Sequence, residues 1–159
     1  MDENTDISAL KSEGFTGFYK VASLMQNGCA HLPEKPGVYM ALNPNMEKSF
    51  LPESVGGHFK GKNPTVSLGE LEENWVDDAV VLYIGQTART LKKRVDEYMR
   101  FGKGKRVGHR GGRLIWQLEN HRDLIICFRV DDNPRALESV LLEKFKRNYG
   151  SLPFANLQK

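Results

Sequence analysis

Two tyrosines and one arginine are the residues of this chain whose types and spacing point to chemistry. Tyr39 ends the segment Gly37-Val38-Tyr39, and Tyr83 begins the segment Tyr83-Ile84-Gly85, which Arg94 follows nine residues later. Both segments lie in short apolar runs of the kind that form β-strands. We therefore expect the two phenols to lie side by side on one small sheet. Beside Arg94 and a carboxylate, they would suit the cleavage of a phosphodiester.

The segment after the second tyrosine motif has the pattern of an amphipathic helix. Apolar residues recur at i, i+4, i+7 and i+8, namely Leu91, Val95, Tyr98 and Met99. Thr87 or Thr90 would cap this helix at its start, and Gly102 would end it. Arg94 borders the apolar stripe, where its guanidinium can hold a phosphate through two hydrogen bonds. The alternative is a structural salt bridge, for example with Glu138.

A second helix, predicted over residues 135–148, offers two carboxylates. Its apolar residues are Leu137, Val140, Leu141, Leu142 and Phe145. At 100° per residue, Glu138 lies about 50° from the mean direction of these side chains, while Glu143 lies on the far side. A carboxylate on an apolar face needs a partner, because burying it alone is costly. A metal ion or Arg94 would supply that partner for Glu138, and Glu143 is a solvated reserve candidate.

Positive charge is concentrated between residues 89 and 113. The formal net charge is only +3, yet this segment has ten Lys or Arg against two acidic residues, whereas residues 70–78 have five acidic residues. A polyanion would be drawn to the first segment and repelled by the second, although the lysines would also serve simply to solvate a helix. The glycine-rich loop at 101–113 predicts sequence-independent contacts with DNA phosphates. The predicted contacts are Lys93, Lys103, Lys105, Arg106, His109, Arg110 and Arg113.

Length and composition set the scale of the fold. A chain of 159 residues with 40% hydrophobic content predicts one core of ordinary size. We expect strands at 37–42, 80–86 and 124–130, and an insertion at about 43–78 with one or two helical turns at 67–76. We expect residues 1–30 to form an N-terminal extension, polar and without regular structure up to about residue 12, that packs on a domain at 31–159.

Other features argue against several classes of protein. The longest apolar runs fall short of the roughly 18 to 20 residues of a membrane span, and the acidic start does not resemble a secretory signal. The basic loop does not match the phosphate-loop pattern, which argues against a nucleotide cofactor. The histidines lack the spacing of zinc ligands. Because Cys29 and Cys127 show no pairing pattern, we expect a reducing, cytoplasmic location.

Taken in order, these segments resemble the GIY-YIG nuclease family from about residue 36 to 156. The likeness comprises Gly37-Val38-Tyr39, Leu82-Tyr83-Ile84-Gly85-Gln86-Thr87, Leu91-Lys92-Lys93-Arg94-Val95, Leu137-Glu138-Ser139-Val140-Leu141-Leu142 and Leu152-Pro153-Phe154-Ala155-Asn156. The chain departs from the family pattern in three respects. Val38 replaces an isoleucine, the interval between the tyrosine motifs is longer, and Tyr98 stands where many members have a histidine.

The resemblance implies an α/β (α+β) domain with a three-stranded antiparallel sheet flanked by helices, and a metal-dependent endonuclease activity on DNA. Glu138 would be the single protein ligand of Mg²⁺ or Mn²⁺, and Arg94 would clamp the phosphate. Tyr39 would orient or deprotonate the attacking water, and Tyr83 would bond the phosphate or share that task. Asn156 would hold a phosphate or pin the end of the chain.

Two other functions stay open at this point. A catalytically inactive nucleic-acid-binding module of the same fold would keep the basic loop. A protein-interaction domain built around the insertion at 43–78 has only the acidic cluster in its favour. The sequence favours the nuclease, because all five motif residues are present.

Overall fold

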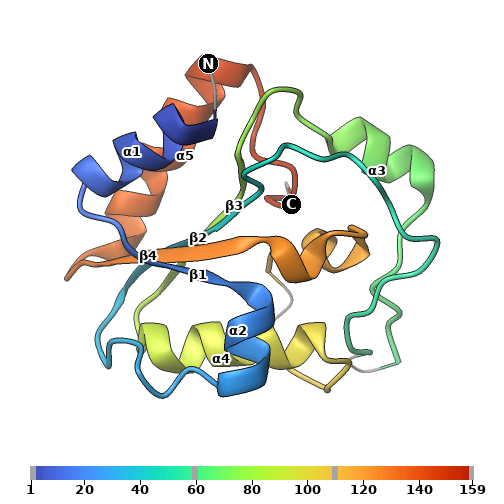
Figure 1. The fold of residues 1–159 in the computed structure, drawn as a ribbon, viewed down its shortest axis with the longest axis horizontal. Coiled ribbons are helices and arrows are strands. Elements are labelled where there is room, and N and C mark those ends of the chain that lie inside the picture. Colours follow the sequence, from blue (N-terminus) through green and yellow to red (C-terminus); the bar gives the residue numbers. More distant parts are fainter. Residues whose placement is uncertain (1–2, 59–60, 109–110, 158–159) are drawn as a thin grey trace.

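The protein is a mixed α and β structure built on one antiparallel sheet (Figure 1). A computed structural model describes residues 3–58, 61–108 and 111–157. Within these ranges the sheet has four strands in the order β1-β4-β2-β3. Their bounds are β1 Thr16–Lys20, β2 Gly37–Leu42, β3 Val81–Thr87 and β4 Ile125–Val130.

The prediction of three strands is therefore wrong by one. The additional strand, β1, comes from the segment that was expected to be an extension, and it pairs with β4 at the edge of the sheet. Its sequence hides it because the strand is irregular. Gly17 and Phe18 both have positive φ, at 95° and 54°, and the pairing register shifts between Thr16 and Tyr19. The two-residue alternation that marks a strand is lost there.

Helices cover both faces of the sheet (Figure 1). The helices α1 and α5 lie on one face, and α2 and α4 lie on the other. Their bounds are α1 Glu3–Ser12, α2 Val21–Asn27, α3 Leu68–Asn74, α4 Leu91–Gly102 and α5 Pro134–Tyr149, with short 3₁₀ turns η1 Arg113–Gln117 and η2 His121–Asp123. The helix α1 corrects the expectation of an unstructured start. Its Leu10 is buried against the α5 face, so tertiary packing orders a sequence of weak helical pattern.

The register of the two central strands places both tyrosine motifs on the α4 face. Tyr39 pairs with Gly85 and Ala41 pairs with Tyr83, so these four residues share one side of the sheet. Gly85 is essential to this arrangement. A Cβ at Gly85 would lie 2.6 Å from Cζ of Tyr39 and 2.7 Å from Cε2 of Tyr83. The glycine of the second motif thus leaves the space that the two phenol rings occupy.

The helix α4 forms where the apolar stripe predicted it. Thr90 caps it, because the Thr90 side chain accepts a hydrogen bond of 3.1 Å from the backbone N–H of Lys93. Near the other end, Gly102 lies flat against the indole of Trp116, where a Cβ would lie 2.5 Å from Cη2 of the ring. The helix therefore packs closely on η1 and on the tyrosine face of the sheet.

One buried side chain fastens the insertion to the core. The Gln117 side chain is fully buried and bonds the insertion at two places. Its Nε2 donates to the carbonyls of Leu51 at 3.2 Å and Val66 at 2.9 Å, and its Oε1 accepts from the N–H of Val66 at 3.0 Å. Val66 stands two residues before α3, which lies to one side of the sheet in Figure 1.

The C-terminal segment closes the outer edge of β3. The side chain of Asn156 accepts from the N–H of Ile84 at 2.9 Å and donates to the carbonyl of Ile84 at 2.8 Å. Next to it, the N–H of Ala155 donates to the carbonyl of Leu82 at 2.8 Å. The amide of Asn156 thus takes the place of a neighbouring strand. Of the two roles expected for this residue, the geometry gives it the structural one.

Replacing Asn156 by alanine should therefore destabilise the fold. Asn156→Ala removes two partly buried hydrogen bonds, and we expect the free energy of unfolding to fall by about 1 to 3 kcal/mol. Urea unfolding followed by circular dichroism measures the change. The matched control is Asn148→Ala, because Asn148 is exposed on α5 and should change stability by less than about 0.5 kcal/mol. Equal midpoints for the two variants would contradict the structural role.

Candidate active site

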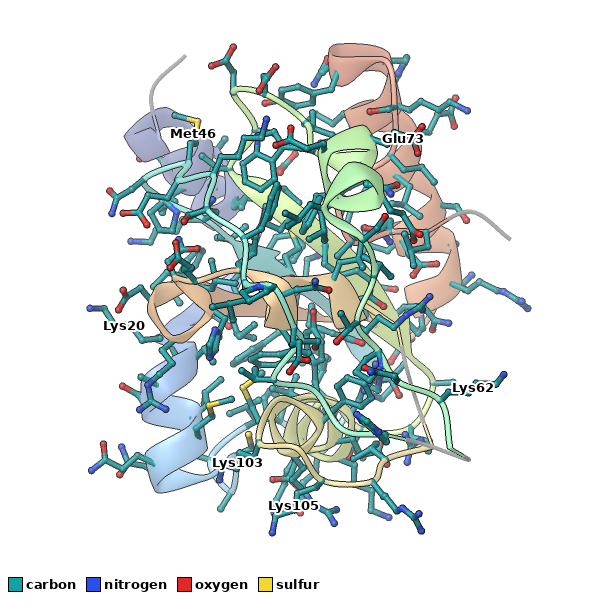
Figure 2. The ribbon with its side chains drawn as sticks, turned by 90° about the vertical axis from the view of Figure 1, so that its right-hand side faces the viewer. Lys20, Met46, Lys62, Glu73, Lys103 and Lys105 are labelled. Atoms are coloured by element: carbon teal, nitrogen blue, oxygen red, sulfur yellow. The ribbon has the colours of Figure 1, made fainter. Side chains whose placement is uncertain are left out.

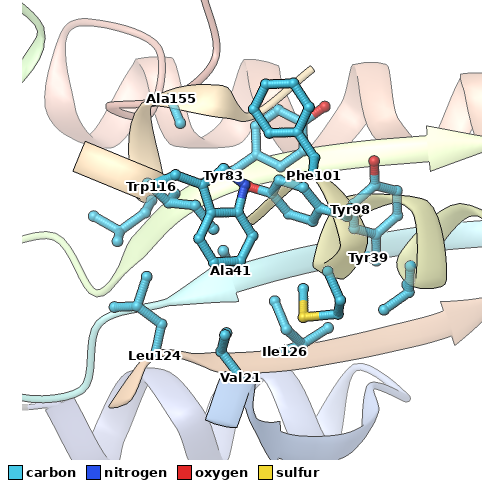
Figure 3. Packing of buried hydrophobic residues seen from close by; sticks show 14 of the residues in the cluster. Val21, Tyr39, Ala41, Tyr83, Tyr98, Phe101, Trp116, Leu124, Ile126 and Ala155 are labelled. Atoms are coloured by element: carbon cyan, nitrogen blue, oxygen red, sulfur yellow. The ribbon is translucent and has the colours of Figure 1, made fainter. Parts of the chain in front are cut away.

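Three tyrosine rings and one guanidinium meet between the sheet and α4. The ring centroids of Tyr39, Tyr83 and Tyr98 lie 5.7 to 5.9 Å apart in each pairing. Figure 3 shows these rings near Trp116 and Phe101, with Tyr98 between Trp116 and Tyr39. The Cζ atom of Arg94 lies 5.5 Å from the ring of Tyr39 and 5.6 Å from the ring of Tyr98. The structure thus brings together the two predicted phenols and the predicted guanidinium.

Arg94 is buried but poorly paired. Its side chain is 1% exposed, and its Nη2 donates one long hydrogen bond of 3.5 Å to the carbonyl of Gly111. Its Nη1 lies 4.0 Å from the carboxylate of Glu97, which already binds Arg89 through two hydrogen bonds of 2.7 and 3.0 Å. Across the part of the chain that the structure describes, Nε and Nη1 have no hydrogen-bond partner. The predicted alternative of a salt bridge to Glu138 does not form.

A buried guanidinium with free donors is costly, because its lost contacts with water are not replaced. The two phenol faces compensate in part through cation–π contacts. The remaining N–H groups of Arg94 are suited to an acceptor that arrives from outside, such as the oxygens of a phosphate.

Tyr39, like Arg94, is buried with a polar group that lacks a hydrogen-bond partner in the described structure. It is fully buried, and its hydroxyl makes no hydrogen bond of ordinary geometry with any residue in the described ranges. Burial, reinforced by the neighbouring Tyr83 hydroxyl, raises the pKa of Tyr39 well above its usual range, although Arg94 acts to lower it. Burial also raises the pKa of Tyr83, again against the influence of Arg94. Both phenols are therefore neutral near pH 7, which favours water orientation over proton abstraction for Tyr39.

A cleft of about 1330 Å³ opens along β3, beside this cluster. Tyr83 and Asn156 lie in its wall next to the sheet, and Glu138 and Arg135 border it from α5. Its border also includes Glu70 and Glu73 of α3, the helix within the insertion. Because Tyr83 touches both the cleft and the buried cluster, it connects the two.

Glu138 is the carboxylate that the structure offers to this cleft. Its side chain is half-buried and makes no hydrogen bond or ion pair within the described ranges. Burial raises the pKa of Glu138, and Arg135 acts in the opposite direction. Glu143 is exposed, as expected, but Val140, counted on the apolar face, is 60% exposed. The helix α5 packs on the sheet mainly through Leu141 and Phe145.

Glu138 would have to hold a metal without help from neighbouring protein ligands. In the described segments, no group of three or more His, Cys, Asp or Glu side chains is arranged to bind a metal ion. A lone carboxylate at an open cleft still fits Mg²⁺, which keeps most of its water and uses one or two carboxylates together with substrate phosphates. A zinc site, which needs several protein ligands, would not fit.

The predicted DNA contacts fall into two groups. Arg113 borders the cleft itself. The others that the structure describes are exposed on α4 and the turn after it, namely Lys93, Lys103, Lys105 and Arg106. Figure 2 shows Lys103 and Lys105 near the bottom of the view and Glu73 on α3 near the top. The charge separation expected from the sequence is thus also a separation in space. His109 and Arg110 lie outside the described residues.

Sequence reasoning missed three contributors to the site. Tyr98 was assigned to the apolar stripe and noted as a departure from the family's histidine, but it was not counted as a site residue, although it stands one helical turn after Arg94 and therefore on the same side of α4. Glu97, three residues after Arg94, gave the same kind of spacing signal. Gly112 gave no signal, because its contact with the tyrosines depends on how a loop folds back on α4.

Comparisons with protein-family models, with curated proteins and with solved structures give no significant match. None of the described helices is both long enough and apolar enough to cross a membrane. The case for a function therefore rests on the motifs and on the geometry of this site.

If Arg94 is kept for function, an apolar residue of similar shape should fold at least as well. For Arg94→Met we expect the free energy of unfolding to be unchanged or higher by up to about 2 kcal/mol, because the desolvated charge is removed and the cation–π contacts are lost. We expect any cleavage of DNA to be abolished. Urea unfolding and a nuclease assay measure the two effects. A loss of more than about 2 kcal/mol would make Arg94 a structural residue.

Proposed function

We propose that the protein is a metal-dependent endonuclease of the GIY-YIG type that hydrolyses phosphodiester bonds of DNA. One observation carries the proposal. Polar atoms of Arg94 and Tyr39 are buried without hydrogen-bond partners in the described structure, and they lie beside a cleft that Tyr83 shares with Glu138. The ordered motifs of the sequence add independent support.

The chemistry requires an oriented water, neutralisation of the charge on the phosphate and a stabilised leaving oxygen. Arg94 would hold the scissile phosphate with its free N–H groups, which act strongly in a water-poor site. Tyr39 and Tyr83, as neutral phenols, would position the water and the phosphate through hydrogen bonds. Tyr83 stands between the two because it borders both the cleft and the buried cluster.

Glu138 would hold one Mg²⁺ or Mn²⁺ at the cleft, together with water and phosphate oxygens. When bound, the ion supplies Lewis-acid stabilisation of the leaving oxygen. The carboxyl of Glu138 must lose its proton to bind the ion. Because its pKa is raised, the apparent affinity for the metal should begin to fall at a higher pH during acidification than for an exposed glutamate.

The charges around the cleft favour one direction of approach for DNA. Arg113 of η1 and Arg135 of α5 border the cleft, and so do Glu70 and Glu73 of α3. A phosphate backbone would be attracted to the first pair and repelled by the second. The exposed cations after α4 would extend the attractive side.

The inactive nucleic-acid-binding module is the second candidate, and one observation favours it. Tyr39 is 0% and Arg94 is 1% exposed, so neither meets a phosphate without some movement of the groups that cover them. A cleavage assay separates the two candidates.

Glu138→Gln should abolish cleavage while DNA binding persists. We expect activity to fall by more than about 100-fold, because even changes behind a metal ligand cost 10 to 100-fold. The assay incubates supercoiled, linear, branched and single-stranded DNA with Mg²⁺ or with chelator, and a mobility-shift assay follows binding.

Glu143→Gln is the matched control, because Glu143 is exposed on the same helix. It should cut DNA like the wild type. Full cutting by Glu138→Gln together with loss in Glu143→Gln would reassign the metal ligand. No cutting by the wild type on any of these DNAs would favour the inactive module.

The exposed cations after α4 should contribute to DNA affinity without regard to sequence. Replacing Lys103, Lys105 and Arg106 together by alanine should weaken binding and reduce the slope of log K against log salt by about 2 to 3, since each phosphate contact contributes about 0.9. The measurement uses the Glu138→Gln background, so that DNA is not cut.

A control variant removes the same charge elsewhere. Lys11, Lys20 and Lys146 are exposed on α1, β1 and α5, and their replacement by alanine should leave the slope nearly unchanged. If both triple variants give the same slope, the turn after α4 is not part of the DNA interface.

A further inference from the structure

Two consecutive backbone carbonyls accept hydrogen bonds from side chains of the candidate site. The hydroxyl of Tyr98 donates a buried hydrogen bond of 2.8 Å to the carbonyl of Gly112. Nη2 of Arg94 donates the long bond of 3.5 Å to the carbonyl of Gly111. The first bond has the length of a strong O–H···O contact, and the second lies at the limit of a hydrogen bond. The Gly112 carbonyl also accepts a longer bond of 3.4 Å from the N–H of Ile115, so the Tyr98 hydroxyl makes the shorter of its two bonds.

Gly112 lies directly against two of the three tyrosines. Its φ is +78°, and a Cβ there would overlap the hydroxyl of Tyr98 and lie 2.9 Å from Cδ2 of Tyr83. Glycine meets both demands, since it accepts positive φ and has no side chain. The backbone can thus pack on the rings without any gap.

The same two glycines form part of the cleft wall on their other side. Gly111 and Gly112 border the cleft together with Tyr83, whereas Arg94 and Tyr39 do not. Gly111 thus contacts both the guanidinium, through Nη2, and the cleft, which Arg94 itself does not border. A phosphate that enters the cleft meets this backbone before it meets the guanidinium.

We infer that Tyr98 is a positioning residue whose hydroxyl holds the Gly111–Gly112 backbone across Arg94 and so controls the access of phosphate oxygens to the guanidinium. The identity of the incoming oxygen rests on the proposed function, whereas the covering of Arg94 does not. If the Gly111–Gly112 backbone moves away, Arg94 loses its weak hydrogen bond to the carbonyl of Gly111. In exchange, Arg94 gains a charged acceptor. The bond from Tyr98 to Gly112 is shorter than the bond from Arg94 to Gly111, so its loss should ease this displacement.

The test compares how fast a reagent reaches Arg94. Phenylglyoxal modifies accessible arginines, and mass spectrometry gives the rate for each residue, with the exposed Arg147 as internal reference. Tyr98→Phe keeps the ring packed on Arg94 and Trp116 but removes the hydrogen bond to Gly112. We expect modification of Arg94 to become about three- to tenfold faster, the range for loss of one neutral hydrogen bond.

Tyr19→Phe is the matched control, because Tyr19 lies on β1 and contacts His31 and Phe128 instead. It should leave the rate at Arg94 unchanged. Gly112→Ala provides a second way to displace the cover, since its methyl group would overlap the Tyr98 hydroxyl. It should also expose Arg94.

Inorganic phosphate separates this inference from the proposed function. If opening limits access, the phosphate concentration that half-protects Arg94 should fall by the same factor in Tyr98→Phe as the modification rate rises. A merely structural role for Tyr98 would not link the two factors. Equal rates at Arg94 in the wild type, Tyr98→Phe and Gly112→Ala would overturn the inference. Faster modification without protection by phosphate would instead overturn the phosphate clamp of the proposed function.

Discussion

The burial of the Arg94 guanidinium between the rings of Tyr39 and Tyr98 is the contact on which the rest of the site depends. A charge in this place is tolerated because the ring faces are electron-rich, yet two of its nitrogen atoms find no acceptor in the described structure. The core is thus less stable here than an apolar core would be. Such a local conflict with the rules of packing is typical of residues that are retained for function.

The elements around this contact have separate tasks. The strands β2 and β3 set the two phenols on one face, and Gly85 leaves room for them. The helix α4 presents the arginine, and α5 brings Glu138 to the cleft from the opposite layer. The insertion borders the cleft with α3, and Gln117 bonds the backbone of Val66 just before that helix. The candidate active site therefore combines residues from the helices on both faces of the sheet.

Local patterns in the sequence predicted the parts of the fold that depend on local physics. The bounds of β2 are as predicted, and α4 is capped by Thr90, one of the two threonines proposed for that position. Patterns failed where distant segments decide the outcome. The helical periodicity of α4 placed Arg94 at the border of the core. Its full burial depends also on the contact with Gly111, which lies in the segment after α4. The role of Asn156 stayed open because an amide can bond a ligand or a strand equally well. The strand β1 was missed because its irregular backbone is not accompanied by the alternating apolar pattern that predicts a strand.

The closing of β3 by Asn156 has a consequence for the behaviour of the molecule in crowded solution. An uncovered outer strand offers a row of backbone donors and acceptors to any passing chain, which can extend the sheet and seed aggregates. Here the amide of Asn156 occupies both groups of Ile84, and Ala155 occupies the carbonyl of Leu82. The strand that carries Tyr83 is thereby protected from intermolecular pairing, while its side chain stays turned toward the cleft.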